Sequence, residues 1–472
     1  MKLVKQQIGR TDVRPRSRSA CMTTLLMDLV FVVIIITSLG RLYQNTPYRW
    51  LAYYASGDPR LALVVSQAIL DHGSIRLDEY EADLPGARFF SHNGHLYDYF
   101  PLGSSLIALP AVAGARHLGH DMRDMTANFH VQFLLALATS LLIASGLYIL
   151  ARNRLTPFAA FLLTTYFFFG TPLVTALMTA YWSHNAALLC AVAALILSLY
   201  SENRFLKNHG VTVDLSIGFL AGLAYISRPT MALFCILMPA WALRNGWRRA
   251  VTVSAGLALS IGGLMLYSLV EYNQLLPPYY AGGRLGGAET FLVAVAGNLI
   301  SPSRGILIHA PLVGIIVLAG LWRLYRQSLS ALGIGCLMWY ALHLAGVSLF
   351  PHWWAGWSYG ARIQADVMPA LFLLAVVLLP CRIDMLRVKG FLVALPLCVL
   401  MAWGIWVHTY QGVLNSTTAK WSKVPDIDQY PHLLWSWKYP QFLASQEQID
   451  NRLDYLAETH PDFQNDNRDE LH

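Results

Sequence analysis

Long apolar stretches separated by short polar ones run along almost the whole chain. A helix needs about 20 residues to cross a hydrocarbon core about 30 Å thick, and apolar stretches of this kind recur as far as residue 410. The pattern therefore predicts an all-α polytopic membrane protein with about eleven transmembrane helices. The predicted spans are 23–43, 130–151, 157–174, 178–200, 214–227, 229–243, 250–271, 305–322, 329–350, 364–381 and 390–410.

The links between the predicted spans indicate which side of the membrane they face. With the N-terminus in the cytoplasm, every cytoplasmic link carries Lys or Arg, as the positive-inside rule requires. These links are Arg152–Arg154, Arg204–Lys207, Arg244–Arg249, Arg323–Arg326 and Arg382–Lys389. We therefore expect a multi-pass membrane protein with a cytoplasmic N-terminus and an extracytoplasmic C-terminus. The apolar stretch 101–115 is expected to be a helix at the outer interface, because one more crossing would place these links outside.

This topology places most of the polar part of the chain outside. The chain divides into a basic N-terminus (1–22), a transmembrane domain (23–410) and an extracytoplasmic tail (411–472). The first outer loop, 44–129, is the largest of the outer segments. Shorter outer segments are expected at 272–304 and 351–362, and the acidic end of the tail is expected to be frayed.

The composition excludes an ordinary soluble protein of this size. Hydrophobic residues make up 56% of the 472 residues and charged residues only 13%, about half of the usual charged share. The net charge of +7 comes from basic residues scattered between apolar stretches, which indicates membrane topology and not nucleic-acid binding. The six cysteines show neither metal-ligand nor redox spacing, so neither a disulfide framework nor a zinc site is indicated.

Asp58 follows the first predicted span, close to the hydrocarbon boundary. Ionised groups are costly there and tend to be functional. One interpretation is a helix cap, because Pro59 and the apolar residues 61–70 are typical of a helix that begins at this point. The other interpretation is a general base that faces an outer cavity. The two roles are compatible, and Asp58 is the candidate catalytic residue.

Arg228 separates two short predicted spans, 214–227 and 229–243. Each has about 14–15 residues, or about 21–23 Å of helix, so the turn between them should lie below the outer surface. An arginine at that depth needs an anionic partner, which is either a protein carboxylate or a lipid-linked phosphate. Arg304 and Arg362 stand at a corresponding depth, each just before a predicted span. The three arginines are therefore candidate phosphate-binding residues.

An aromatic segment, residues 353–362, precedes the span at 364–381. Tryptophans at a membrane boundary are by default an interfacial belt. Yet Gly356 and Gly360 between the aromatic residues indicate a folded loop whose backbone is free to approach a ligand. Aromatic faces also suit the apolar faces of sugars. The candidate residues of a substrate cavity are Tyr97, Tyr99, His184, His352, Trp354, Trp357 and Tyr359.

Metal binding has little support in the sequence. The histidines match no metal motif. Asp58 alone makes a poor cation site, because hard cations need several oxygen ligands. Metal dependence stays open at this point, and no cofactor is assigned.

Short motifs carry a resemblance to a known family. They are SGD at 56–58, GLAYISRP at 222–229, PSRG at 302–305 and WAGWSYGAR at 354–362. On these motifs, and on a plan shared over residues 20–410, the chain resembles the GT-C superfamily of polyprenyl-phosphate-sugar glycosyltransferases. That superfamily includes protein O-mannosyltransferases and the lipid A aminoarabinose transferase.

The chain also departs from that family. Members often continue the Gly-Asp pair with a second acidic residue and an aromatic one, whereas Pro59 and Arg60 follow here. Asp58 is thus the only carboxylate of the motif, which puts in doubt any mechanism or metal site that needs two. Ala361 stands where proline is common.

The resemblance implies a transmembrane catalytic domain whose large first outer loop contains interfacial helices. The donor would be a sugar on a polyprenyl phosphate, transferred with inversion to a lipid, glycan or protein acceptor. Asp58 would act as the base, and Arg228, Arg304 and Arg362 would stabilise the departing phosphate. Membrane lipids are the other expected partner, and nucleic acid is not.

Two alternatives to a transferase of this kind stay open. One is an O-antigen ligase or polymerase, which would take a pyrophosphate-linked donor. The other is a transporter or flippase of lipid-linked sugars. Transporters usually show repeated halves, and this chain shows one large outer loop and no repeat.

Overall fold

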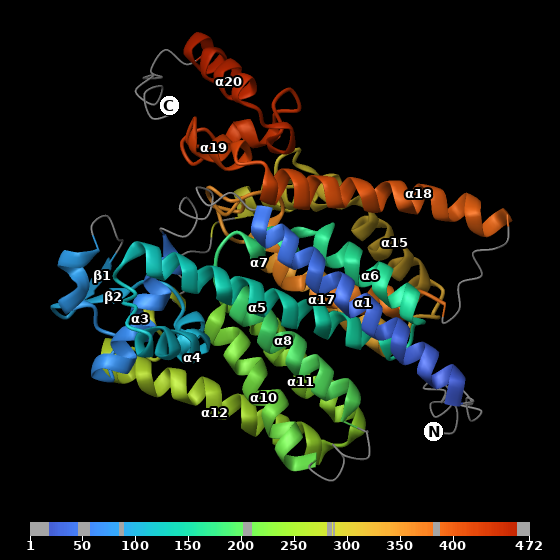
Figure 1. The fold of residues 1–472 in the computed structure, drawn as a ribbon, viewed down its shortest axis with the longest axis horizontal. Helices are drawn as coiled ribbons and strands as arrows, with labels where there is room; N and C mark the ends of the chain where they lie inside the picture. The colour runs from blue at the N-terminus through green and yellow to red at the C-terminus, as the bar shows by residue number, and fades with distance from the viewer. Residues whose placement is uncertain are drawn as a thin grey trace.

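The computed structural model describes residues 18–45, 57–84, 89–201, 210–280, 286, 288–380 and 388–459. Nearly all of this part of the chain is helical, and its sheet has two short strands (Figure 1). Seven of its helices are long and apolar enough to cross a membrane, which identifies a multi-pass integral membrane protein. They are α1 (Arg18–Asn45), α5 (Met125–Arg152), α8 (Ser183–Tyr200), α10 (Gly210–Ser227), α12 (Trp247–Tyr272), α16 (Ala331–Ser348) and α18 (Val388–Ile405) with its π-helical continuation (Trp406–Leu414).

An eighth span results if α6 (Pro157–Phe169) and α7 (Pro172–Met178) are counted together. The two helices bend by 62° at the break between them. Pro172 has no N–H to donate to the preceding turn, so the helix predicted at 157–174 stops before it and restarts. The predicted count of eleven spans is not confirmed: the described residues contain seven, or eight with the bent pair.

Three more predicted spans form helices that are too short for a full crossing. The span predicted at 229–243 begins with a single 3₁₀ turn, and the one at 364–381 begins with two turns of this kind. Pro229, Pro311 and Pro369 lie in the first turns of helices within these segments, where a missing N–H costs no hydrogen bond. The elements are η2 (Pro229–Met231), α11 (Ala232–Ala242), η3 (Leu243–Asn245), α14 (Ile306–His309), α15 (Pro311–Tyr325), η6 (Arg362–Val367) and α17 (Met368–Leu378).

Helices α10 and α12 make the closest helix–helix contact of the bundle. A Cβ at Gly218 would lie 1.8 Å from the backbone oxygen of Val253, and a Cβ at Gly256 would lie 2.0 Å from that of Leu215. Only glycine allows backbones to approach this closely, as is common between membrane helices. The crossing fixes the position of the end of α10, where Arg228 follows.

Acidic residues inside the apolar helices pair with arginines of the basic links. Asp28 of α1 accepts hydrogen bonds from Arg152 and Tyr148 of α5. Asp214 of α10 accepts one from Arg249 of α12 at 2.8 Å. A charge inside an apolar helix is costly unless it is paired. These acids therefore join neighbouring helices at one end of the bundle. The other end faces the part of the chain between α1 and α5, which we call the first outer segment after its predicted position.

The first outer segment folds against that other end of the bundle, at the left of Figure 1. Its elements are α3 (Asp58–His72), η1 (Asp78–Asp83), β1 (Phe89–His92), β2 (His95–Asp98) and α4 (Gly103–His117). The strands are antiparallel with Phe90 opposite Tyr97, and the turn uses Asn93 and Gly94 at φ of 50° and 79°. Helix α4, predicted as an interfacial helix at 101–115, has 15 residues and packs on α3 and α8.

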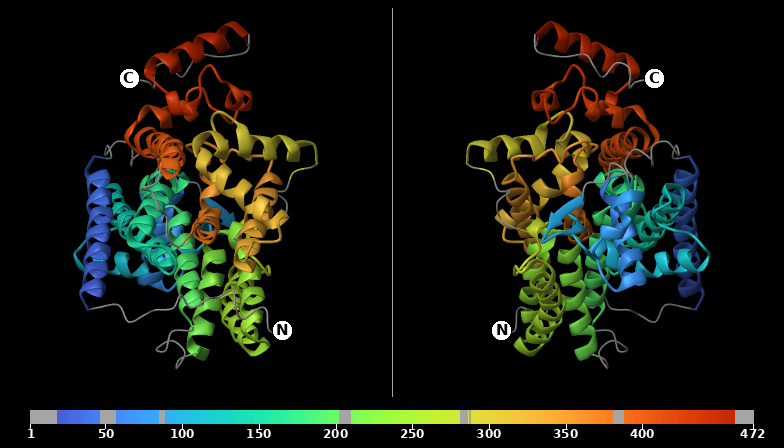
Figure 2. Two further views of the ribbon diagram at one scale, coloured as in Figure 1. Left: turned by 90° about the vertical axis from the view of Figure 1, so that its right-hand side faces the viewer. Right: turned by 90° about the vertical axis from the view of Figure 1, so that its left-hand side faces the viewer.

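The described part of the predicted tail, residues 411–459, is folded, and most of it lies at the top of Figures 1 and 2. Trp421, Ile427 and Leu434 form a small hydrophobic core with Trp353 of the aromatic segment. The remaining elements are η4 (Pro278–Tyr280), α13 (Ala288–Ile300), α19 (Thr417–Lys423), η8 (Pro431–Trp435), η9 (Gln441–Leu443) and α20 (Gln446–Thr459).

Some predictions fall outside the described residues. They concern most of the basic N-terminus, Ser56, the link Arg204–Lys207, most of the link Arg382–Lys389 and the acidic end 462–472.

Candidate functional site

Arg228 pairs with a carboxylate that is far away in the sequence. It follows the last residue of α10 in an extended conformation, and its Nε donates to Oδ2 of Asp366 at 2.7 Å. Asp366 lies in η6 and is fully buried, whereas the Arg228 side chain is 18% exposed. Of the two partners that the sequence left open for Arg228, the structure shows the protein carboxylate.

His184 joins Asp366 to a second arginine. Its Nδ1 lies 2.8 Å from Oδ1 of Asp366, and its Nε2 accepts a hydrogen bond from Nε of Arg362 at 3.3 Å. An imidazole nitrogen that accepts carries no proton, so the other nitrogen is the donor and the ring is neutral. The guanidinium of Arg362 also lies over the ring of Trp182, 3.8 Å from its centroid.

Two hydroxyl groups complete what we call the Asp366 cluster: Asp366, Arg228, His184, Arg362, Ser183 and Thr230. Thr230 donates to Oδ2 of Asp366 at 2.6 Å, and Nη1 of Arg228 donates to Ser183 at 2.9 Å. The cluster brings the start of α8, the end of α10 and the start of η6 to one point. It holds the guanidinium groups of Arg228 and Arg362 around the buried carboxylate of Asp366 and the neutral ring of His184.

Tyr279 shows that Asp58 lies near this cluster. Burial raises the pKa of the Tyr279 hydroxyl. Arg228 and Arg362 act to lower that pKa, whereas Asp58 and Asp366 act to raise it further. Such effects require charges within a short distance. The structure thus places three of the sequence-predicted site residues, Asp58, Arg228 and Arg362, in one region, at the end of the bundle where α3 and α4 pack.

Asp58 is the first residue of α3 and follows the N-cap, Gly57. A carboxylate in the first turn is stabilised by the helix dipole. The helix behind it is buried from Pro59 to Ala68, so Asp58 is held by a packed element and not by a loose loop. The predicted position near the helix cap is therefore confirmed, and the role as base stays a prediction.

A pocket next to Tyr279 contains a second carboxyl group, Asp98. Its Oδ1 accepts a hydrogen bond from the backbone N–H of Phe100 at 3.1 Å. Burial raises the pKa of Asp98 to about 7, and the charge of Asp58 contributes to the increase. A carboxyl group with a pKa near neutrality is typical of functional sites.

Arg304, the third predicted phosphate-binding residue, lies in a different environment. It is 2% exposed and donates to the backbone oxygens of Trp354, Ser303 and Gly356. It also donates to the side chains of Gln441 and Ser422, both in the tail. The structure does not bring Arg304 together with Arg228. Its hydrogen bonds hold the tail against the aromatic segment.

The predicted aromatic and histidine residues of the aromatic segment also contact the tail. Trp354 and His352 both bind Asp428, at 2.7 and 2.8 Å, and Trp357 donates to Asp426 at 2.7 Å. These three side chains face the tail. Tyr359 differs: it lines a small pocket together with Arg362, Trp182 and Thr179, next to the Asp366 cluster.

Two predicted cavity residues of the first outer segment have separate roles. Tyr99 lines the pocket that contains Asp98. Tyr97 is fully buried, and its hydroxyl donates to Glu271 at 3.0 Å, which ties the β-hairpin to the end of α12. Glu271 also binds Arg76 at 3.1 Å.

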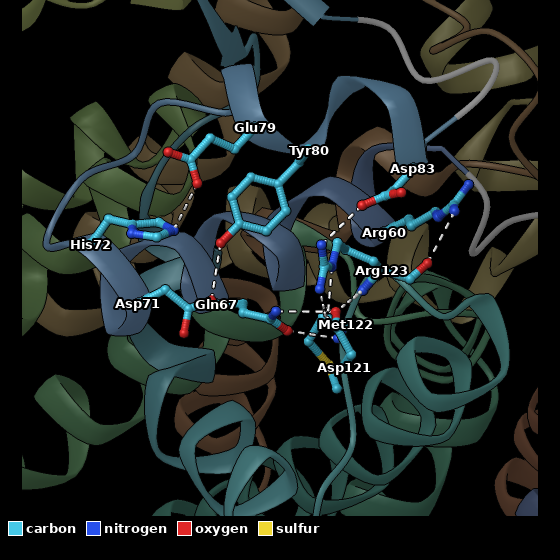
Figure 3. A network of polar contacts seen from close by, with 10 residues as sticks. All are labelled: Arg60, Gln67, Asp71, His72, Glu79, Tyr80, Asp83, Asp121, Met122 and Arg123. Carbon is cyan, nitrogen blue, oxygen red and sulfur yellow. Dashed lines mark hydrogen bonds and ion pairs between the residues drawn. The ribbon is translucent and has the colours of Figure 1, made fainter.

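A polar network makes the rest of the first outer segment rigid (Figure 3). Arg123 binds Asp121 at 2.6 Å and Asp83 at 2.9 Å. Gln67 of α3 donates to Asp121 and accepts from the backbone of Met122. The segment before α5 is thereby fastened to α3, and this supports the helix that carries Asp58.

Sequence reasoning missed the central residue of the site, Asp366. One signal was available, because Asp366 is an acidic residue inside a predicted apolar span, where ionised groups mark function or pairing. Thr230, Ser183 and Tyr279 gave no such signal, since hydroxyl groups are common at span ends. Among the described residues, no three His, Cys, Asp or Glu side chains are grouped so that they could hold a metal ion.

No protein-family model matches this chain, and a search of curated proteins finds no match either.

Proposed function

We propose that this protein is a membrane glycosyltransferase of the GT-C type. It transfers a sugar, with inversion, from a polyprenyl-phosphate donor to an acceptor at the extracytoplasmic face of a bacterial inner membrane. The single observation that carries the proposal is the hydrogen-bonded cluster that joins Arg228 and Arg362 through Asp366 and His184. A carboxylate and two guanidinium groups at one site are what transfer from a phosphate leaving group requires.

The proposed step uses the carboxylate as the base. The acceptor hydroxyl attacks the anomeric carbon, and its proton passes to Asp58 as the new glycosidic C–O bond forms. The bond between the anomeric carbon and the phosphate oxygen breaks, and its electron pair stays on the polyprenyl phosphate. The developing negative charge is stabilised by guanidinium groups that are already in position.

The two arginines have different shares in this step. The charge of Arg228 is balanced by Asp366, and its Nη1 is bound to Ser183, so it is mainly a positioning residue. Arg362 lines the small pocket with Thr179, Trp182 and Tyr359. It is therefore the residue we assign to the donor phosphate. Arg304 is assigned to the tail and has no share in the proposed step.

The test is transfer from a polyprenyl-monophosphate sugar by protein reconstituted in liposomes. We expect Asp58→Asn to lower the rate by about 10²–10⁴-fold, the usual contribution of a general base. Glu81→Gln is a matched control, because Glu81 is an exposed carboxylate of the same outer segment. Activity near that of the unchanged protein in a folded Asp58→Asn variant would show that Asp58 is not the general base.

The same liposomes separate the proposal from the two alternatives. Release of free polyprenyl phosphate with sugar transfer supports the enzyme. Movement of the intact donor between leaflets, without bond cleavage, contradicts it and favours a flippase. Cleavage of a pyrophosphate-linked donor, with no cleavage of the monophosphate, favours a ligase or polymerase.

A further inference from the structure

Arg362 belongs to η6, but the groups that hold its guanidinium come from the start of α8. The guanidinium lies over the ring of Trp182, 3.8 Å from the centroid, and its Nε donates to Nε2 of His184 at 3.3 Å. Trp182 is the N-cap residue of α8, and His184 is the second residue of that helix. The start of α8 therefore covers one face of the guanidinium and binds it at Nε.

His184 is itself held from the interior of the bundle. Its Nδ1 donates to Oδ1 of Asp366 at 2.8 Å, and the side chains of His184 and Asp366 are 1% and 0% exposed. A neutral imidazole that donates through Nδ1 presents an acceptor at Nε2, because the hydrogen bond at one nitrogen sets the role of the other. The buried carboxylate thus makes Nε2 an acceptor for Arg362, which is partly exposed.

This arrangement determines which nitrogens of Arg362 can meet a ligand. A guanidinium binds phosphate through two of its nitrogens in parallel, in a planar fork. Because Nε is engaged by His184, the fork that suits a phosphate is the one made by Nη1 and Nη2. Arg362 lines a small pocket with Thr179, Ser358 and Tyr359, so this is the side from which a phosphate would be bound.

We infer that His184 is the positioning residue of the donor-phosphate site, and that its bond to Nε holds Arg362 with both terminal nitrogens toward the phosphate. The inference rests on the proposed function, because it concerns the arginine assigned there to the donor. His184 is too deeply buried to touch the substrate, so it acts through Arg362.

Two substitutions separate the two nitrogens of the imidazole. The side-chain amide of asparagine ends as far from the main chain as Nδ1 does, so His184→Asn keeps a donor for Asp366 and loses the acceptor for Arg362. The amide of glutamine reaches one bond further, to the distance of Nε2. His184→Gln therefore keeps the acceptor for Arg362 and loses the donor for Asp366. A positioning role and a purely structural role predict opposite orders for the two variants.

The affinity for an isoprenoid phosphate provides the first measurement. The probe is farnesyl phosphate, whose phosphorus NMR signal is followed during titration with the full-length protein in a maltoside detergent, which contains no phosphorus. We expect His184→Asn to weaken binding about tenfold, as when one hydrogen bond to a charged group is lost. His184→Gln should stay within about threefold of the unchanged protein, since it keeps that bond.

Stability should follow the opposite order. His184→Asn keeps the hydrogen bond to the buried carboxylate of Asp366, so it should resist unfolding in detergent better than His184→Gln does. In an Arg362→Met background the two variants should bind farnesyl phosphate equally, because no guanidinium is left to position. His120→Asn, at an exposed histidine, is the control and should bind as the unchanged protein does.

Three results overturn the inference. They are no binding of farnesyl phosphate by the unchanged protein, equal affinities of His184→Asn and His184→Gln, and tighter binding by His184→Asn. Arg362→Lys decides the question if neither His184 variant folds. It keeps the charge but has no Nε, so binding should fall about tenfold. Unchanged affinity of Arg362→Lys overturns the inference as well.

Kinetics distinguish this inference from the proposed function. In the transfer reaction, His184→Asn should raise the KM for the donor about tenfold and leave the KM for the acceptor unchanged. Binding of farnesyl phosphate with the expected order of variants, but without any sugar transfer, would contradict the proposed function and support the role of His184. Sugar transfer without that order would support the proposed function and contradict the role of His184.

Discussion

Arg228 and Arg304 lie in similar sequence contexts but in very different environments. Each stands within two residues of a proline, next to a predicted span end. Arg228 binds a buried carboxylate and remains 18% exposed next to Asp58 and Arg362. Arg304 is 2% exposed and binds backbone oxygens and tail side chains. The groups that each arginine binds, and not its residue type or its depth in the membrane, distinguish a candidate site arginine from a structural one.

We expect the largest loss of stability from Asp366→Ala, which removes the carboxylate partner of Arg228. Asp366→Ala leaves Arg228 without its buried anionic partner and removes the acceptor for His184. Breaking a buried pair in this way costs about 3–5 kcal/mol. Unfolding in detergent, followed by circular dichroism, measures the loss. The double variant Asp366→Ala, Arg228→Met should lose less than the single one, and equal losses would contradict the pairing.

Arg304→Met is the corresponding change in the other environment. It removes the five hydrogen bonds that Arg304 donates to backbone oxygens and to the tail side chains of Gln441 and Ser422, which costs about 3 kcal/mol in total. We expect the tail to become sensitive to limited proteolysis, while transfer per folded molecule stays unchanged. Arg326→Met, at an exposed arginine, is the control. A transfer defect in the folded Arg304→Met protein would contradict the structural role and support the predicted role of Arg304 in phosphate binding.

Arg362→Met tests whether an arginine of the Asp366 cluster affects transfer more than it affects stability. Because Arg362 is assigned to the donor phosphate, we expect transfer to fall about a hundredfold, as when one preplaced donor is removed. The free energy of unfolding should fall less than in Asp366→Ala, since the hydrogen bond from Arg362 goes to the neutral ring of His184 and not to a buried carboxylate. Full transfer activity with a large loss of stability would show that Arg362, like Arg304, has a structural role and does not bind the donor phosphate.

The smallest effect concerns pH and Asp98. Burial raises the pKa of Asp98 to about 7 in the folded protein, from the value of 3.8 that is usual for an exposed aspartate. Between these values the unfolded chain releases the proton first, so stability falls as pH rises from about 4 to about 7. Asp98→Asn should remove this slope and gain about 1 kcal/mol at pH 8, a value reduced for partial solvent screening. An unchanged slope in unfolding measured at several pH values would contradict the raised pKa.

Much of the local structure follows from sequence pattern. The helices α1, α5, α8, α10, α12 and α16 all lie at predicted spans. The turn at Asn93-Gly94 and the helix that starts at Asp58 follow rules that act over a few residues. The span count was not confirmed, because prolines such as Pro172 and Pro311 divide apolar stretches into helices too short to cross.

The site was less predictable than the helices. Sequence reasoning grouped Asp58, Arg228, Arg304 and Arg362 in one cavity, whereas in the structure Arg304 binds the tail and only Arg228 and Arg362 belong to the Asp366 cluster. It also missed Asp366, which lies 138 residues from Arg228 along the chain. Trp354 and Trp357 were assigned to a cavity, and in the structure their indole N–H groups bind carboxylates of the tail.

The pattern of apolar and polar residues is enough to establish a helical membrane protein whose polar residues lie at the ends of its segments. The free energy of transferring apolar side chains from water to lipid is nearly additive along the chain, so hydropathy along the sequence measures it directly. Which charges meet depends on the tertiary packing. A buried charge takes its partner from whichever helix packs beside it, and that packing depends on contacts such as Gly218 on Val253, which no local pattern records. Arg228 meets Asp366 and Arg304 meets the tail for this reason.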